Sequence, residues 1–166
     1  TAAEAWEHLH GLDEKSPVEQ SVFFADAPKV DDIAQDAELD ARWERLLALR
    51  SEITKALETA RRDKTIGLSL DAEVLLQADA ETTAFLNENR ALLQELCIVS
   101  SLRVVSEAGD VAFVAGEEMK NLQIAVQPAP GNKCERCWTI SPSVGEDSEH
   151  PTLCSRCLAV VKELVG

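Results

Sequence analysis

Four cysteines near the end of the chain have the residue type and spacing to bind a metal. They form two Cys-x-x-Cys pairs, in the stretches KCERCW and CSRC, with sixteen residues between the pairs. Two thiolates at this spacing can share one zinc ion in a tight turn, and two such turns complete a tetrahedral site that leaves no open position for catalysis. We therefore predict one structural zinc ion held by Cys134, Cys137, Cys154 and Cys157.

Two alternatives for these cysteines remain open at this point. The pairs could form disulfides, although the sequence shows no secretory signal and a reducing compartment, the cytoplasm, is expected. His150 lies in the loop between the pairs and could replace one thiolate as a ligand. The fifth cysteine, Cys97, lies in the apolar stretch ELCIVSSL and is predicted to be an inert core residue.

The first pair carries two side chains that folding alone does not explain. Arg136 lies between two predicted ligands, and Trp138 follows the second ligand directly. A rigid turn that presents a guanidinium and an aromatic plane suits RNA, since Arg bonds phosphates or base edges and Trp stacks on an unpaired base. The other interpretation is that Trp138 covers the zinc site or packs on a neighbouring domain.

The charge of the chain limits how such an RNA contact could be made. The net charge is −14 over 166 residues, which excludes a broad electrostatic grip on nucleic acid or an anionic membrane. Residues 128–166 carry only −1 of this total. A local contact at this end is therefore expected. No catalytic acid–base pair, nucleophile triad or phosphate-binding glycine loop can be assembled from the sequence.

The patterns along the rest of the chain predict an α+β protein. Residues 36–63 show the three- and four-residue spacing of a long amphipathic helix, with Leu39, Trp43, Leu46, Ile53, Leu57 and Ala60 on one face. The cluster Arg61, Arg62 and Lys64 would complement that helix's dipole at its end. Residues 81–96 predict a second helix. Alternating patterns predict strands near 70–76, 98–105, 111–115 and 122–126, the first of them with one wet face.

Several stretches resemble one family. KCERCW followed by CSRC resembles the zinc-binding end of bacterial isoleucyl-tRNA synthetases. TAAEAWEHL, at residues 1–9, is similar to a segment of the helical anticodon-binding domain of that family, and ALETARRDKTIGLSLDAEVLL, at 56–76, is similar to a later stretch. Since the chain lacks an initiator Met and begins on a helical pattern, we expect a C-terminal fragment of a longer protein.

The resemblance implies a division into three parts. Residues 1–65 would be the end of the helical anticodon-binding domain, 66–127 a small α+β junction domain, and 128–166 the zinc-binding module that contacts tRNA. The parent would join isoleucine to its tRNA, and ATP would bind only in the absent catalytic domain. The resemblance assigns Arg136 and Trp138 to tRNA. It also implies the preceding domains of the synthetase as partners, and we expect a monomer with no membrane partner.

Two other functions remain as alternatives. The first is a zinc-stabilised protein-interaction module that binds no RNA, which the apolar patch Val22-Phe23-Phe24 would suit. The second is a zinc finger of the kind found in DNA glycosylases that excise oxidised bases. That family needs a basic DNA cleft and an N-terminal Pro nucleophile, whereas this chain is acidic and begins with Thr1.

Overall fold

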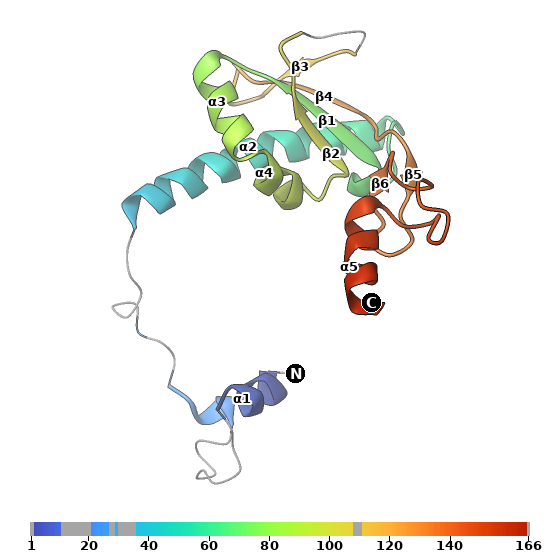
Figure 1. Ribbon diagram of the computed structural model, residues 1–166. Helices are drawn as coiled ribbons and strands as arrows, with labels where there is room; N and C mark the ends of the chain where they lie inside the picture. The colour runs from blue at the N-terminus through green and yellow to red at the C-terminus, as the bar shows by residue number, and fades with distance from the viewer. Residues whose placement is uncertain (1, 11–20, 27–28, 30–35, 108–110, 166) are drawn as a thin grey trace. The chain divides into compact units, whose positions relative to one another are not determined.

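The long amphipathic pattern forms helix α2, Ala37–Arg62, which runs across one face of a small sheet (Figure 1). This computed structural model describes residues 2–10, 21–26, 29, 36–107 and 111–165. The buried face of α2 consists of Leu46, Leu49, Ile53 and Leu57, at the spacing expected of a helix that packs on one side. Each fully buried leucine or isoleucine contributes about 1.5–3 kcal/mol of apolar burial.

The first turns of α2 depart from the prediction. Leu39 and Trp43 were expected on the buried face, but they are 45% and 37% exposed. The reason is that this end of the helix extends past the sheet (Figure 1), so no strand lies beneath it. Leu49, which the predicted face did not include, is fully buried.

The sheet has four strands in the order β2-β1-β4-β3. The central strand β1, Ala72–Gln77, pairs parallel with β2, Ser101–Val104, and antiparallel with β4, Gln123–Pro128. The edge strand β3, Val114–Ala115, pairs antiparallel with β4. A short 3-10 turn, η4, Ser69–Asp71, leads into β1. Helices together with a mixed sheet confirm the predicted α+β class.

The crossover between the parallel strands is made by two helices instead of the predicted single helix. These are α3, Ala80–Glu88, and α4, Arg90–Cys97, which meet at Asn89. The amide of Asn89 is buried, accepts two hydrogen bonds from Arg42 of α2, and donates one to the Phe85 carbonyl. Because α4 ends at Ile98 in the left-handed conformation, the following strand begins at Ser101 and not at 98.

One apolar core joins α2, α3, α4 and the inner face of the sheet. The prediction that one face of β1 is exposed to solvent was wrong at Glu73, which is only 3% exposed. Its carboxylate accepts hydrogen bonds from Gln127 Nε2 at 2.6 Å and Ser101 Oγ at 3.1 Å, and these partners make its burial tolerable. Arg61 of the basic cluster bonds the Gly67 carbonyl and Ser69 Oγ, consistent with a structural role.

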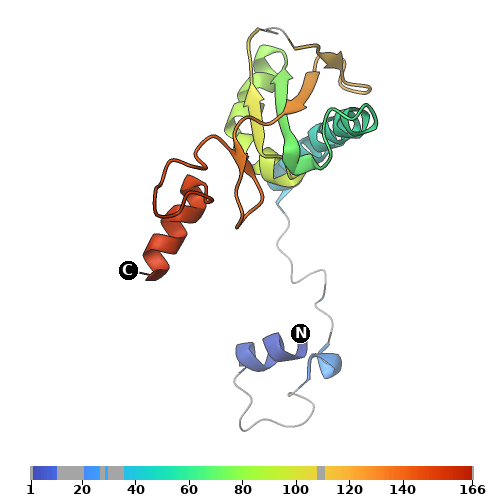
Figure 2. The ribbon, with the colours of Figure 1, turned by 90° about the vertical axis from the view of Figure 1, so that its right-hand side faces the viewer.

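The remaining elements follow β4 and form the cysteine module, which we call the knuckle (residues 131–165). It contains a two-stranded hairpin, β5, Asn132–Lys133, and β6, Ile140–Ser141, and ends in helix α5, Ser155–Val165. Its small core consists of Cys134, Val144, Cys154 and Cys157, separate from the core of the sheet. Figure 2 shows the hairpin and α5 beside one end of the sheet.

Contacts along the chain divide it into two compact units, residues 1–39 and 40–166. The first unit contains α1, Ala2–His10, and the short 3-10 helix η2, Val22–Phe24. The second contains the sheet and the knuckle. The predicted boundaries at 65/66 and 127/128 stay predictions, although α2 shares its core with the sheet. Within the described part of the chain, none of the helices combines the length and apolarity needed to cross a membrane.

Candidate metal centre

The structure brings all four predicted ligands together. The Sγ atoms of Cys134, Cys137, Cys154 and Cys157 lie within 4.8 Å of one another. A tetrahedral zinc ion with Zn–S bonds of about 2.3 Å places its sulfurs about 3.8 Å apart. The Cys137 and Cys154 sulfurs are 3.7 Å apart, which matches that edge. The donor set therefore fits zinc in size and chemistry, and ligation itself stays a prediction.

The first cysteine pair is held in a closed turn. The Trp138 N–H donates to the Cys134 carbonyl at 2.8 Å, and the Cys134 N–H donates to the Thr139 carbonyl at 3.0 Å. Trp138 has a φ of 65°, a left-handed conformation that is unusual for a bulky residue. The hairpin's entry also requires Gly131, whose φ is 105° and whose added Cβ would lie 2.3 Å from the Ser141 carbonyl carbon.

The second pair is positioned by helix α5. Cys154 precedes the helix, its carbonyl accepts from the Leu158 N–H at 2.9 Å, and Cys157 lies in the first turn. The Cys154 N–H also donates to the Cys134 sulfur at 3.3 Å. The start of a helix carries partial positive charge. Two of the four sulfurs therefore lie at the start of this helix.

The thiol pKa values show how unevenly the cluster holds protons. Burial raises the pKa of the Cys154 thiol to about 11. Burial opposes ionisation of Cys137 as well, but hydrogen bonds from Thr139 outweigh it and lower the pKa of that thiol to about 6. The Cys137 thiol therefore ionises more readily than the Cys154 thiol, and metal binding would displace the protons of both.

The alternatives for the cysteines find no support in the described residues. All five cysteines are free thiols, and 3.7 Å between the Cys137 and Cys154 sulfurs is far longer than a disulfide bond of about 2.05 Å. The group of residues able to hold a metal consists of the four cysteines without His150. Cys97 is 7% exposed, and burial raises its pKa to about 11, which fits the predicted inert core residue.

The two residues predicted to contact RNA are both exposed, but differently placed. The Trp138 side chain is 62% exposed, so it does not serve as a cover over the cysteines. Arg136 is exposed too, yet its Nη1 lies 3.6 Å from the Cys157 sulfur. The guanidinium is therefore partly engaged with the cysteine cluster. Whether either residue meets RNA stays a prediction.

Two further residues of this site were not identified from the sequence. The Lys133 ammonium lies 5.6 Å from the centre of the Trp138 ring, in a cation–π arrangement. Attraction to the Cys137 sulfur raises the pKa of the Arg156 guanidinium. A signal for Arg156 did exist, because it occupies the same place inside the second Cys-x-x-Cys as Arg136 does in the first.

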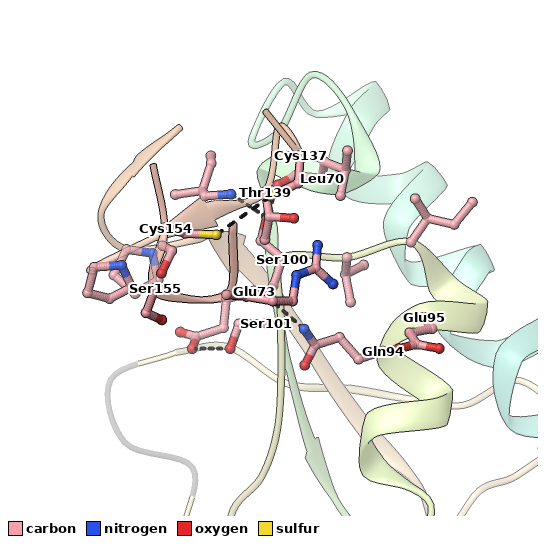
Figure 3. Close-up of a pocket in the computed structure, with 17 residues that line it drawn as sticks. Leu70, Glu73, Gln94, Glu95, Ser100, Ser101, Cys137, Thr139, Cys154 and Ser155 are labelled. Atoms are coloured by element: carbon pink, nitrogen blue, oxygen red, sulfur yellow. Dashed lines mark hydrogen bonds between the residues drawn. The ribbon is translucent and has the colours of Figure 1, made fainter. Parts of the chain in front are cut away.

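A pocket of about 640 Å³ lies between the knuckle and the sheet (Figure 3). In this view Cys154 and Ser155 of the knuckle lie across from Gln94 and Glu95 of α4. The Ser100 hydroxyl links the two sides: it donates to the Leu70 carbonyl and accepts from the Ile140 N–H at 2.8 Å. The knuckle is thus joined to the sheet by a specific contact besides the chain itself.

Comparison with known proteins agrees with the chemistry of the site. Residues 131–160 match a family described as "Zinc finger found in FPG and IleRS". The chain is 49% identical over 164 residues to the isoleucine–tRNA ligase of Desulfotalea psychrophila, covering 99% of this chain and 18% of the relative. The ligases of Geobacillus thermodenitrificans and Geobacter sulfurreducens are 42% and 45% identical over 98% of this chain. This chain spans 17–18% of the length of these relatives.

Proposed function

Because the chain resembles one part of the isoleucine–tRNA ligases along nearly its whole length, we propose that it is the C-terminal, tRNA-contacting portion of such an enzyme. The parent would be a class I synthetase that joins isoleucine to its tRNA. ATP and the chemical step would belong to preceding domains. In this chain, Cys134, Cys137, Cys154 and Cys157 would hold one structural zinc ion, whose binding energy would supply folding energy to the knuckle.

One observation carries the tRNA-binding part of this proposal. Trp138 is 62% exposed although it follows a metal ligand directly, and its backbone is fixed by the turn that places Cys134 and Cys137. An aromatic plane held rigidly in solvent is a stacking platform for an unpaired base. Lys133 over the same ring adds a positive charge beside this platform.

Arg136 supports the same contact. Only its Nη1 is directed to sulfur, at 3.6 Å from Cys157. The side chain is otherwise exposed, so its other N–H groups could donate to a phosphate or a base edge. Arg136 and Trp138 together would then present a guanidinium group and an aromatic ring to the tRNA.

The strongly acidic charge of the chain is compatible with this role. Residues 1–127 carry −13, so this part of the chain would add little to phosphate binding. The knuckle would make a small contact, while the preceding domains of the synthetase would supply most of the affinity. We further propose that residues 1–65 end the helical anticodon-binding domain, that 66–127 form a junction domain, and that the enzyme is a cytoplasmic monomer.

The test uses the longer enzyme with and without residues 128–166. Isoleucine-dependent ATP–pyrophosphate exchange reports the catalytic domain, and tRNA charging reports docking of the tRNA. The proposal expects exchange to survive and charging to collapse. Survival of both activities would show that the knuckle is only a structural cap.

One observation favours a second candidate, the protein-interaction module. Phe23 and Phe24 of η2 are 85% and 64% exposed. Two adjacent exposed phenylalanines suit a protein partner or a neighbouring domain. Trp138 fluorescence, measured with Trp6 and Trp43 replaced by Phe, separates the two functions: tRNA quenches it if the knuckle binds RNA and leaves it unchanged if it does not.

A further inference from the structure

The end of α2 and the segment that joins it to β1, residues 61–71, lie beside the knuckle, and we call them the α2–β1 loop. The first residue of β1 pairs with Pro128, the last residue of β4, from which the chain continues into the knuckle. The Leu70 carbonyl accepts from the Ser100 hydroxyl, and this hydroxyl accepts from the Ile140 N–H of the knuckle at 2.8 Å. The loop and the β5–β6 hairpin therefore lie at the same end of the sheet (Figure 1).

The α2–β1 loop is locally basic in an acidic chain. It contains three basic and two acidic residues, a net +1, whereas residues 1–127 as a whole carry −13. One of the acidic side chains is used inside the loop: the Asp71 carboxylate accepts from the Gly67 N–H at 3.2 Å and from the Leu68 N–H at 2.6 Å. Because physiological salt screens exposed charges beyond about 8–10 Å, the acidic remainder of the chain does not exclude a local contact with phosphate here.

The three basic side chains of the loop are used differently. Arg61 donates to a carbonyl and to a hydroxyl within the loop, so it is bound inside the protein. The Arg62 side chain is 75% exposed, and Lys64 is exposed as well. Among the described residues, Arg62 makes a single ion pair, at 3.8 Å to its neighbour Asp63, and Lys64 makes none. Two of the three positive charges are therefore available to a partner.

The backbone at Lys64 points to a reason for this lysine outside the fold. Lys64 follows helix α2 with a φ of 61°, the left-handed conformation for which glycine is the usual residue at a helix end. A residue with a Cβ is less stable in this conformation than glycine. A positive charge at the end of a helix offsets this strain only in part, since an exposed charge interacts weakly with the helix dipole. A charged binding partner would explain the strained lysine better than the fold does.

We propose that Arg62 and Lys64 form a phosphate-binding site that positions the tRNA backbone beside the knuckle. This inference rests on the proposed tRNA contact of the knuckle and adds a contact of a different kind to it. Arg62 would bond a phosphate through its planar guanidinium, and Lys64 would act as a point charge. Phosphate contacts fix the position and register of a nucleic acid, whereas a ring such as Trp138 stacks on a single base.

The test measures tRNA binding to the longer enzyme over a range of salt concentrations. Each phosphate contact releases counterions, so the logarithm of the binding constant falls with the logarithm of the salt concentration in proportion to the number of contacts. Arg62→Gln and Lys64→Gln should each reduce this slope by about 1, and the double variant by about 2.

Lys120→Gln is the matched control for these variants. Lys120 is also an exposed lysine, but it lies in the loop between β3 and β4, which enters β4 at Gln123. Gln123 pairs with Gln77 at the end of β1, so the control removes the same charge from the opposite end of the sheet. Its salt slope should equal that of the parent.

Trp138→Ala distinguishes a failure of this inference from a failure of the proposed function. Loss of a stacked base should weaken binding at every salt concentration and leave the slope unchanged. If Trp138→Ala weakens binding while Arg62→Gln and Lys64→Gln keep the slope of the control, the knuckle contacts tRNA and the phosphate site is overturned. If the loop variants reduce the slope and Trp138→Ala has no effect, the phosphate site stands and the stacking contact is wrong.

Lys64→Gly gives a second readout that a merely structural role would not produce. Glycine removes the left-handed strain, so the unfolding temperature of the 166-residue chain should rise while the salt slope of tRNA binding in the longer enzyme falls. A lysine that served only the end of the helix would give the opposite result for stability, because its favourable charge would be lost. A lower unfolding temperature together with an unchanged salt slope would overturn the proposal.

Discussion

At the scale of the residue, Trp138 carries the proposed tRNA contact. Trp138→Ala should weaken tRNA binding by roughly 1–3 kcal/mol, the usual value for one lost base–aromatic stack. The affinity for zinc should not change, since the ring is 62% exposed and the cysteines do not depend on it for cover. The measurement is the dissociation constant for tRNA in the longer enzyme, with zinc content determined in parallel.

Trp138→Phe is the matched control for this substitution, because it keeps an aromatic plane at the same position. It should retain most of the binding. If the Ala and Phe variants both bind tRNA as the parent does, Trp138 is not part of the RNA contact. If both lose zinc, the ring has a structural role that its exposure conceals.

At the scale of the element, Glu52 of helix α2 holds the loop between β3 and β4 by hydrogen bonding. Its carboxylate is nearly buried, accepts a hydrogen bond from Lys55 at 3.0 Å and another from the Glu118 N–H at 3.3 Å. Burial alone would raise the pKa of this carboxyl, but Lys55 and the loop amides outweigh it and lower the pKa below the ordinary value of 4.5. The ionised form is therefore the one that holds the loop.

A group whose pKa is lowered by folding stabilises the protein above its unfolded pKa. The contribution of Glu52 should be complete above about pH 4.5 and decrease as the pH falls further, through the lower folded value. Denaturant midpoints of the parent and of Glu52→Gln are measured across this range. Acid would also release any bound zinc, but from both proteins alike, so the difference between them isolates the carboxylate. A difference that does not change with pH would contradict this assignment.

The β5–β6 hairpin is the second element for which the structure makes a sharp prediction. Gly131→Ala should destabilise the knuckle strongly, because φ is 105° and the new Cβ would lie 2.3 Å from a backbone carbon of Ser141. Gly145 is a natural control, with φ of 103° and no atom within 4 Å of the added Cβ. Gly145→Ala should cost only the backbone strain, about 1–2 kcal/mol.

The thermal unfolding temperatures of the two glycine variants, measured with zinc present, distinguish backbone strain from steric overlap with the added Cβ. The Gly131 variant should unfold at a clearly lower temperature than the Gly145 variant. Equal shifts would mean that the close approach of Gly131 to Ser141 does not control the hairpin.

At the scale of the whole molecule, the two separate cores predict two levels of stability. The core of the sheet is built mainly from leucines and isoleucines, whereas the knuckle's small core consists mainly of three metal-ligand candidates. Removal of zinc by a chelator should therefore unfold residues 131–165 and leave the sheet intact. Hydrogen exchange measured before and after chelation tests this, and protection lost uniformly throughout residues 40–165 would show one cooperative unit instead.

Features set by local pattern could be predicted from the sequence, and features set by distant partners could not. The cysteine spacing predicted the cluster of four sulfurs, and helical periodicity predicted α2 almost to its ends, at Ala37–Arg62. The burial of Glu73 depends on Gln127 and Ser101, which lie on neighbouring strands. The break between α3 and α4 depends on Arg42 reaching Asn89 from another helix.

The same distinction applies within the site. The neighbouring positions of Arg136 and Cys137 in the sequence gave no sign that the guanidinium would reach Cys157 instead. The left-handed conformation of Ile98 is equally hidden, because glycine is the residue that normally marks such a helix end. The Arg136 contact arises only when the two cysteine pairs meet, whereas the Ile98 conformation is local but carries no residue signal.

The Ser100 hydroxyl, which accepts from the Ile140 N–H at 2.8 Å, limits how far the knuckle can swing about its connection to the sheet. A freely swinging knuckle would distribute the Trp138 ring through a large volume, and its effective concentration at any single nucleotide would fall. A tethered one keeps the ring in a small volume, so less orientational entropy is lost when the ring meets its partner. A single hydroxyl outside the cysteine cluster would in this way raise the affinity of the proposed tRNA contact at Trp138.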